Sequence, residues 1–127
     1  MTIDIIQILQ KAITAHKEGK LQEAESGYRQ AIELKPDHDE SLNSLGVLLH
    51  SLGRLDEAET NYKKTIEINR NHINANNNLG VLLHGRGKLD EAERYYKKTI
   101  ELKPDNQKAN NNLGVLLHSL GKLDEAE

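Results

Sequence analysis

Hydrophobic residues recur along this chain at the three-and-four spacing of an amphipathic helix. One set stands at positions i, i+3, i+4 and i+7 of a single stretch: Leu45, Leu48, Leu49 and Leu52. The stripe then restarts: Leu55, Ala58, Tyr62 and Ile66. This spacing predicts two helices. Gly53 lies between them and predicts a turn, because glycine adopts the left-handed backbone conformation at little cost.

The predicted helix pair is repeated along the chain. Leu-Gly-Val-Leu-Leu-His occurs at 45–50, 79–84 and 113–118, at an interval of 34 residues. Leu-Asp-Glu-Ala-Glu occurs at 55–59, 89–93 and 123–127, and Tyr-Lys-Lys-Thr-Ile-Glu at 62–67 and 96–101. A more divergent first copy keeps the same register: Gly19, Leu21, Ala24, Tyr28, Ile32 and Pro36. We therefore predict one domain over 1–127, with repeats 5–38, 39–72, 73–106 and an incomplete 107–127.

Local signals refine the expected helices. Acidic residues open the second helix of a repeat, and glutamate and lysine four residues apart predict the ion pairs Glu59–Lys63 and Glu93–Lys97. Pro36 and Pro104 end the second helices of their repeats, whereas Arg70 replaces the proline in the second repeat and predicts a softer boundary. Small residues predict close helix packing: Gly46, Gly80, Gly114, Ala24, Ala58 and Ala92.

Composition narrows the class of protein. The chain has 127 residues, no cysteine, tryptophan or phenylalanine, and a net charge of −3. Disulfides, zinc–thiolate sites and thiol nucleophiles are therefore excluded, and the interspersed charge gives no footprint for nucleic acid. No apolar run approaches the roughly 20 residues needed to cross a bilayer. We predict an all-α, cytoplasmic chain with no membrane segment and no nucleic-acid partner.

No catalytic or cofactor motif emerges from the sequence. Gly80 and the segment 85–88 resemble a phosphate-binding loop only faintly, because Leu82 and Leu89 stand where a glycine and a serine or threonine are needed. One histidine recurs in each repeat: His16, His50, His84 and His118. Equivalent positions lie roughly 10–20 Å apart, too far to share one metal ion. We expect no enzyme, no cofactor and no metal site.

The chain resembles the tetratricopeptide repeat family over residues 5–127. The resemblance is carried by the recurring Leu-Gly, the glycine turn, the alanine with an aromatic residue four positions later, and the closing proline. This resemblance implies a right-handed α-solenoid of antiparallel helix hairpins, in which the first helices line a concave groove that holds peptides. Leu42, Asn76 and Asn110 depart from the family, which usually has a large aromatic residue there. Some members clamp chaperone tails with lysine, but the matching positions here are Leu9, Ile13, Ser44, Asn74 and Asn78, so that clamp is not expected.

The resemblance places a candidate peptide-binding set on the inner face. Its members are Asn43, Ser44, Val47, His50, Asn77, Asn78, Val81, His84, Asn111, Asn112, Val115 and His118. Runs of asparagine at 76–78 and 110–112 oppose helix propensity, and an amide ladder can pair with any peptide backbone. A similar ladder lines the repeats of O-linked N-acetylglucosaminyltransferases. The alternative is that these asparagines are merely tolerated near helix starts and reflect duplication of one unit.

Two functions remain open. The chain is either an interaction scaffold for a peptide or protein, or the substrate-recruiting front of a longer enzyme such as a glycosyltransferase. Only 123–127 belong to the second helix expected after a turn near Gly121. Helix 107–120 should therefore leave four leucines partly uncovered: Leu113, Leu116, Leu117 and Leu120. We expect a fragment of a longer array, or self-association through this uncapped end.

Overall fold

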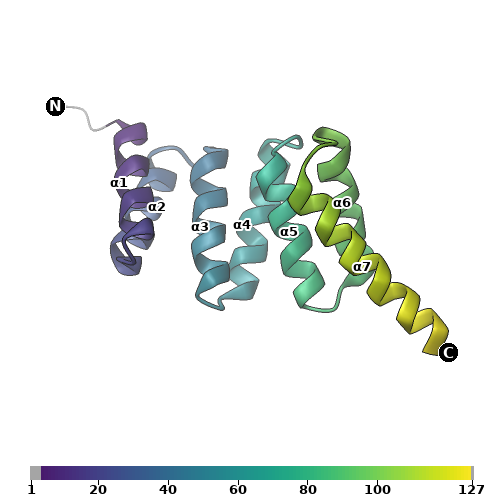
Figure 1. Ribbon diagram of the computed structural model, residues 1–127. Coiled ribbons are helices and arrows are strands. Elements are labelled where there is room, and N and C mark those ends of the chain that lie inside the picture. Colours follow the sequence, from purple (N-terminus) through teal and green to yellow (C-terminus); the bar gives the residue numbers. More distant parts are fainter. Residues whose placement is uncertain (1–3, 127) are drawn as a thin grey trace. The chain divides into compact units, whose positions relative to one another are not determined.

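The computed structural model describes residues 4–126, with side chains as far as Gly121 (Figure 1). Within that range the chain is helical apart from short turns and contains no strand. The helices are α1 (Ile5–Lys17), α2 (Leu21–Leu34), α3 (Asp39–Ser51), α4 (Leu55–Ile68), α5 (Ile73–Gly85), α6 (Leu89–Leu102) and α7 (Gln107–Ala126). They form two compact units, Met1–Arg70 with α1 to α4 and Asn71–Glu127 with α5 to α7. The all-α fold class predicted from the sequence is confirmed.

The first unit consists of two helix hairpins. Helix α1 packs on α2 and α3 packs on α4, while α2 also contacts α3 and joins the two pairs. The core is built from small and aliphatic side chains around two buried tyrosines, Tyr28 and Tyr62. Ion pairs connect α2 to the start of α4: Arg54 Nη1 lies 2.9 Å from Glu25 Oε1, and Arg29 Nη2 lies 3.7 Å from Glu57 Oε1.

The turns inside the hairpins form as the sequence predicts. Gly19, Gly53 and Gly87 all have a φ between 77° and 79°, the left-handed region that other residues avoid. Arg70 replaces the proline in the second repeat, yet the end of the second helix does not move. Helix α4 ends at Ile68, the residue equivalent to the last residue of α2 and of α6. The packed hairpin, not the proline, therefore sets the length of the second helix.

A glycine and a tyrosine fix the spacing of two hairpins. A methyl group added at Gly46 would lie 2.7 Å from the ring of Tyr62, and one at Gly80 would lie 2.7 Å from the ring of Tyr96. The first hairpin distributes this space differently. Ala12 replaces the first-helix glycine, and Gly27 stands opposite, where an added methyl group would lie 2.8 Å from the side chain of Ala12. The close approach expected from small residues therefore holds, but the small residue is not always on the same helix.

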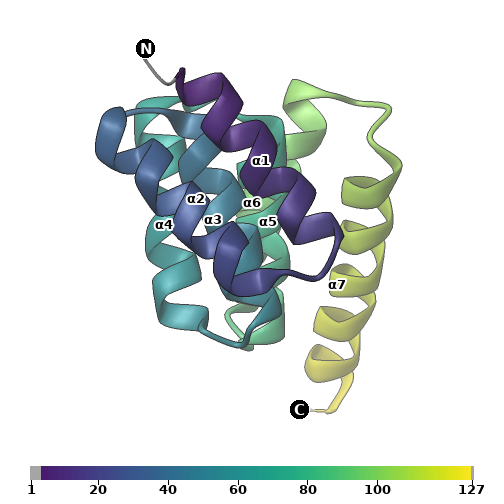
Figure 2. The same ribbon diagram turned by 90° about the vertical axis from the view of Figure 1, so that its left-hand side faces the viewer.

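The second unit contains the hairpin of α5 and α6, with α7 packed mainly on α6 and also touching α5. Helix α7 is continuous through Gly121, so the predicted turn there does not form (Figure 2). The continued helix keeps the backbone hydrogen bonds that a turn at this glycine would interrupt. Leu116 is fully buried, contrary to expectation, while Leu117 is 45% exposed and Leu113 and Leu120 are half-buried.

Side chains cap the first helix of each hairpin. Asp4 accepts from the backbone N–H of Ile6. His38 Nδ1 accepts from Ser41 N at 3.3 Å, and His72 Nδ1 accepts from Ala75 N at 3.0 Å. Each cap satisfies one of the backbone donors that every helix start leaves open. Histidine is an unusual capping residue, and the sequence analysis did not identify this role.

Candidate functional site

In the first unit the candidate residues lie on α3, and they differ in accessibility. Asn43 is only 6% exposed, so it presents little surface to a ligand. Ser44 is half-buried, and Val47 is 36% exposed. Helix α1 lies against α3. Residues at equivalent positions of the repeat therefore differ in their exposure to solvent. Asn43 is the member of the predicted set that is least accessible to a ligand.

In the second unit α5 and α7 bring predicted residues together. Asn112 Nδ2 donates to Asn77 Oδ1 at 3.5 Å, which joins the two helices through their amides. Asn78 and Asn112 are half-buried, and Asn111 is exposed. The amides that meet belong to two different predicted rows. The contact is diagonal, because residue 77 pairs with residue 112 and not with residue 111.

One valine in each of three first helices is exposed at the same repeat position. Val47 and Val81 are 36% and 37% exposed, and Val115 on α7 is 60% exposed. A valine that is left in water contributes no burial energy to the fold. Val81 and Val115 therefore give the α5/α7 surface apolar positions beside its amides. We name the set Asn77, Asn78, Val81, Asn111, Asn112 and Val115 the amide face.

The histidine row is explained by contacts inside the hairpins. Nδ1 lies 3.0 Å from the tyrosine hydroxyl in the pair His16–Tyr28 and 3.3 Å in the pairs His50–Tyr62 and His84–Tyr96. The rings meet edge to face at centroid distances of 5.9 to 6.1 Å. Sequence analysis assigned these histidines to the inner face and missed their partners. The signal was available, because a tyrosine follows each of the three histidines at the same interval.

Burial shifts the pKa of at least one group in each of these three pairs, and it raises the pKa of Tyr28 and of Tyr62. It lowers the pKa of His50, because the protonated ring would lose its hydration. It raises the pKa of Tyr96 to about 12, since the phenolate would lose hydration in the same way. A neutral tyrosine hydroxyl can donate to an unprotonated Nδ1. These side chains therefore hold the first and second helices of a hairpin together. His118 on α7 is exposed.

Two of the asparagines that prompted the ladder hypothesis satisfy the backbone instead. Asn76 is buried, and its Nδ2 donates to the carbonyl of His72 at 2.8 Å. Asn110 Nδ2 donates to the carbonyls of Asn106 and Pro104 at 2.9 and 3.1 Å. Both lie in the first turn of their helices. For these two residues the alternative reading, tolerance near a helix start, is the better account.

The described part of the chain offers few other features that point to a function. Among its residues no group of three or more histidine, aspartate or glutamate side chains is placed to hold a metal ion. None of its helices is long and apolar enough to span a membrane. The candidate surface is therefore defined by amides, valines and their spacing on paired helices.

Comparisons with known proteins identify the family and the fold. Models of the tetratricopeptide repeat match residues 4–71, 42–105 and 95–127. A comparison with curated protein sequences finds no match. The first TPR of Spaghetti (RPAP3), bound to the HSP90 peptide SRMEEVD, is 24% identical with a TM-score of 0.88, over 92% of this chain and 93% of that chain.

Two further solved structures are similar. The Sgt2 TPR domain from Aspergillus fumigatus is 16% identical with a TM-score of 0.90, over 99% of this chain and 85% of that chain. A mutant O-GlcNAc transferase from Thermobaculum terrenum is 26% identical with a TM-score of 0.85, over 93% of this chain but only 24% of that chain. Because the family models together match far more than half of its residues, the chain belongs to the tetratricopeptide repeat family.

Proposed function

We propose that this chain is a non-catalytic protein-interaction scaffold that binds an extended peptide segment across the amide face. The observation that supports it is the hydrogen bond between Asn77 and Asn112 on neighbouring helices, beside the exposed Val81 and Val115. Its length of 3.5 Å lies beyond the usual range for a hydrogen bond, so little energy is lost when a ligand replaces it.

The chemistry of the amide face favours recognition of the backbone over the side chains. Each asparagine side chain carries two N–H donors and one carbonyl acceptor, which matches the alternating donors and acceptors of an extended peptide. Val81 and Val115 add apolar contact that many side chains can use. The partner should therefore be an extended segment of low sequence specificity. On α3 of the first unit, Ser44, Val47 and His50 provide residues of a similar kind, with Asn43 largely covered.

The ligand of the RPAP3 domain is an acidic chaperone tail, and we do not extend it to this chain. The positions that match a tail clamp hold Leu9, Ile13, Ser44, Asn74 and Asn78, so the cationic side chains of such a clamp are missing. A terminal carboxylate buried without a cation is strongly disfavoured. Acidic C-terminal peptides should bind more weakly than neutral internal segments of the same length.

A peptide array tests the proposal directly. We expect Asn77→Ala and Asn111→Ala to weaken binding across most sequences by a similar factor, because the lost bonds go to the peptide backbone. Asn110→Ala is the matched control, since its amide serves its own helix start and its change should alter stability, not affinity. Unchanged binding by the Asn77 and Asn111 variants would remove the amide face from consideration.

A second function has one specific observation in its favour. The similarity to a bacterial O-GlcNAc transferase covers nearly all of this chain but about a quarter of the enzyme. The same surface would then recruit substrates for a catalytic domain located elsewhere in a longer polypeptide. The genomic reading frame decides between the two, because the second function requires a glycosyltransferase domain in the same frame.

A further inference from the structure

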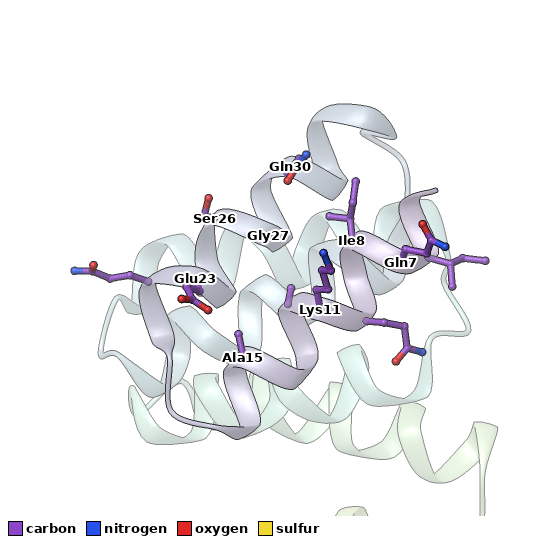
Figure 3. Close-up of a pocket in the computed structure, with 12 residues that line it drawn as sticks. Gln7, Ile8, Lys11, Ala15, Glu23, Ser26, Gly27 and Gln30 are labelled. Atoms are coloured by element: carbon purple, nitrogen blue, oxygen red, sulfur yellow. The ribbon is translucent and has the colours of Figure 1, made fainter. Parts of the chain in front are cut away.

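A hollow of about 990 Å³ lies between α1 and α2 in the first unit (Figure 3). Its floor is apolar and its rim carries charge: Ile8, Ala12, Ala15 and Gly27 on the floor, Lys11 and Glu23 on the rim. We name it the end groove. It shares no residue with the amide face, so its role is independent of the function proposed above.

The equivalent surface of the next hairpin is covered by a helix. Ile8, Lys11 and Ala15 correspond 34 residues later to Leu42, Leu45 and Leu49, all of which are at most 4% exposed. There α2 contacts α3 and forms ion pairs with α4. The surface that α1 and α2 present at the end groove is therefore the surface on which a helix packs in the following repeat.

Smaller side chains turn this surface into a hollow. Ala15 stands where the next repeat has Leu49, and Gly27 stands where it has Asn61. Polar side chains such as Gln10, Lys11 and Gln30 line much of the hollow, as at a solvated end of a repeat array. Ile8 nonetheless remains on the floor, and Ile6 lines the same hollow while 60% exposed. The occupant must therefore bring larger side chains than α2 presents to α3.

Charges at the rim define the occupant further. In the next hairpin, Arg54 pairs with Glu25 and Glu57 pairs with Arg29, and these two partners are four residues apart on α2. Equivalent charges stand at the end groove and beside it: Glu23 lines the groove in the place of Glu57, and Lys20, three residues earlier in the chain, takes the place of Arg54. Lys20 Nζ also lies 3.6 Å from Glu18 Oε1, in an exposed ion pair that a partner's carboxylate can share. A helix with an acidic residue and a basic residue four positions later would meet both charges.

From these observations we infer that the end groove binds an amphipathic helix of a separate polypeptide. That helix carries glutamate or aspartate followed four residues later by lysine or arginine, with large aliphatic side chains over Ala15 and Gly27. The contact extends the packing of α2 on the second hairpin by one further helix. It places a folded helical partner against the first hairpin.

A labelled peptide provides the test. Residues 87–104 of this chain contain α6, with Glu93 and Lys97 at the positions equivalent to Glu25 and Arg29. Its fluorescence anisotropy should show saturable binding to the full chain at micromolar concentration. Glu23→Lys should weaken binding about fivefold, and a peptide with Lys97→Glu should restore it.

Ala15→Glu should weaken binding about tenfold, because the packed helix would bury an unpaired carboxylate on the floor of the hollow. Gly85→Ala, which lies in the second unit with open space around it, is the control and should bind the peptide as the unaltered chain does. Equal binding by Glu23→Lys and Ala15→Glu, or no saturable binding, would overturn the inference. Concentration-dependent dimers that disappear in Ala15→Glu would overturn it as well, because the occupant would then be a second copy.

A fused helix guards against a peptide that is too short to fold alone. Residues 88–106 joined directly ahead of Ile5 reproduce the native connection between 106 and 107 and raise the local concentration of the helix. We expect a higher Tm than for the chain without the fusion, and no such gain when both chains carry Ala15→Glu. A fusion that leaves the Tm unchanged refutes the groove as a helix site.

Discussion

Replacing Gly46 by alanine should destabilise the first unit although alanine is the better helix former. The added methyl group would lie 2.7 and 2.8 Å from two ring carbons of Tyr62, a side chain that is 1% exposed. The ring cannot move away freely, since its hydroxyl bonds to His50 and the side chain is almost fully buried. Either the ring shifts and weakens that bond, or the two helices separate.

The expected loss follows from three opposing contributions. Alanine gains about 1 kcal/mol over glycine in a helix interior. Overpacking a buried site costs about 1–3 kcal/mol, and a weakened hydrogen bond adds about 1 kcal/mol. The net loss should be about 1–3 kcal/mol. Ala12 occupies this position in the first hairpin, where Tyr28 is also buried and Gly27 lies opposite Ala12. A methyl group can therefore be accommodated at this position, and the loss of stability should not exceed this range.

Gly114 provides the matched control. It occupies the same repeat position on α7, but an added methyl group would meet nothing within 4 Å. Gly114→Ala should therefore gain up to about 1 kcal/mol from helix propensity. Urea denaturation followed by far-ultraviolet circular dichroism measures both, and hydrogen exchange in α3 and α4 localises the loss. If Gly46→Ala proves as stabilising as Gly114→Ala, the glycine–tyrosine contact does not limit the hairpin.

Three further outcomes are expected. Burial lowers the pKa of His50 in the folded chain, so below pH about 6.5 the unfolded chain binds more protons than the folded chain. The free energy of unfolding should therefore be largest above pH about 6.5 and fall as the pH drops towards the lowered pKa. His50→Gln should flatten this pH dependence in urea titrations. Gly53→Ala should cost about 1–2 kcal/mol because its φ is +77°, whereas Gly85→Ala, with open space around it, should be neutral or stabilising in thermal unfolding. Burial alone would raise the pKa of Glu25, but hydrogen bonds from Arg29 and Arg54 outweigh burial and lower that pKa. Glu25→Gln should lower the free energy of unfolding by at most about 1 kcal/mol. A double-mutant cycle with Arg54→Gln should show a coupling energy that vanishes in concentrated salt.

Structural features that depend only on neighbours along the chain could be predicted from the sequence. The hairpin turn at Gly53 and the pair Glu59–Lys63, at 2.8 Å, both follow from local spacing. The 34-residue period also located the tyrosines and small residues that pack the hairpins. These features were predictable because each requires only backbone conformation or a one-turn separation on a helix.

The candidate site was less predictable because it depends on contacts between helices. Asn43 and Asn77 are equivalent in sequence, yet Asn43 is nearly covered and Asn77 bonds to Asn112. A single sequence period cannot distinguish these environments. The turn predicted at Gly121 was wrong for a related reason. Gly53 turns the chain with a φ of 77°, and the helix after it packs on α3, whereas α7 continues through Gly121 as one helix.

The contact of Gly27 with Ala12 in the first hairpin, and of Gly46 with Tyr62 in the second, limits how these repeats can be exchanged. The first hairpin carries its closely packed glycine on the second helix, whereas the second hairpin carries it on the first helix. A hybrid repeat that took its first helix from one copy and its second helix from another would be either too crowded or too loose. Shuffling of modules, by recombination or by engineering, should therefore succeed only when the junction falls between hairpins, so that both helices are inherited as one block.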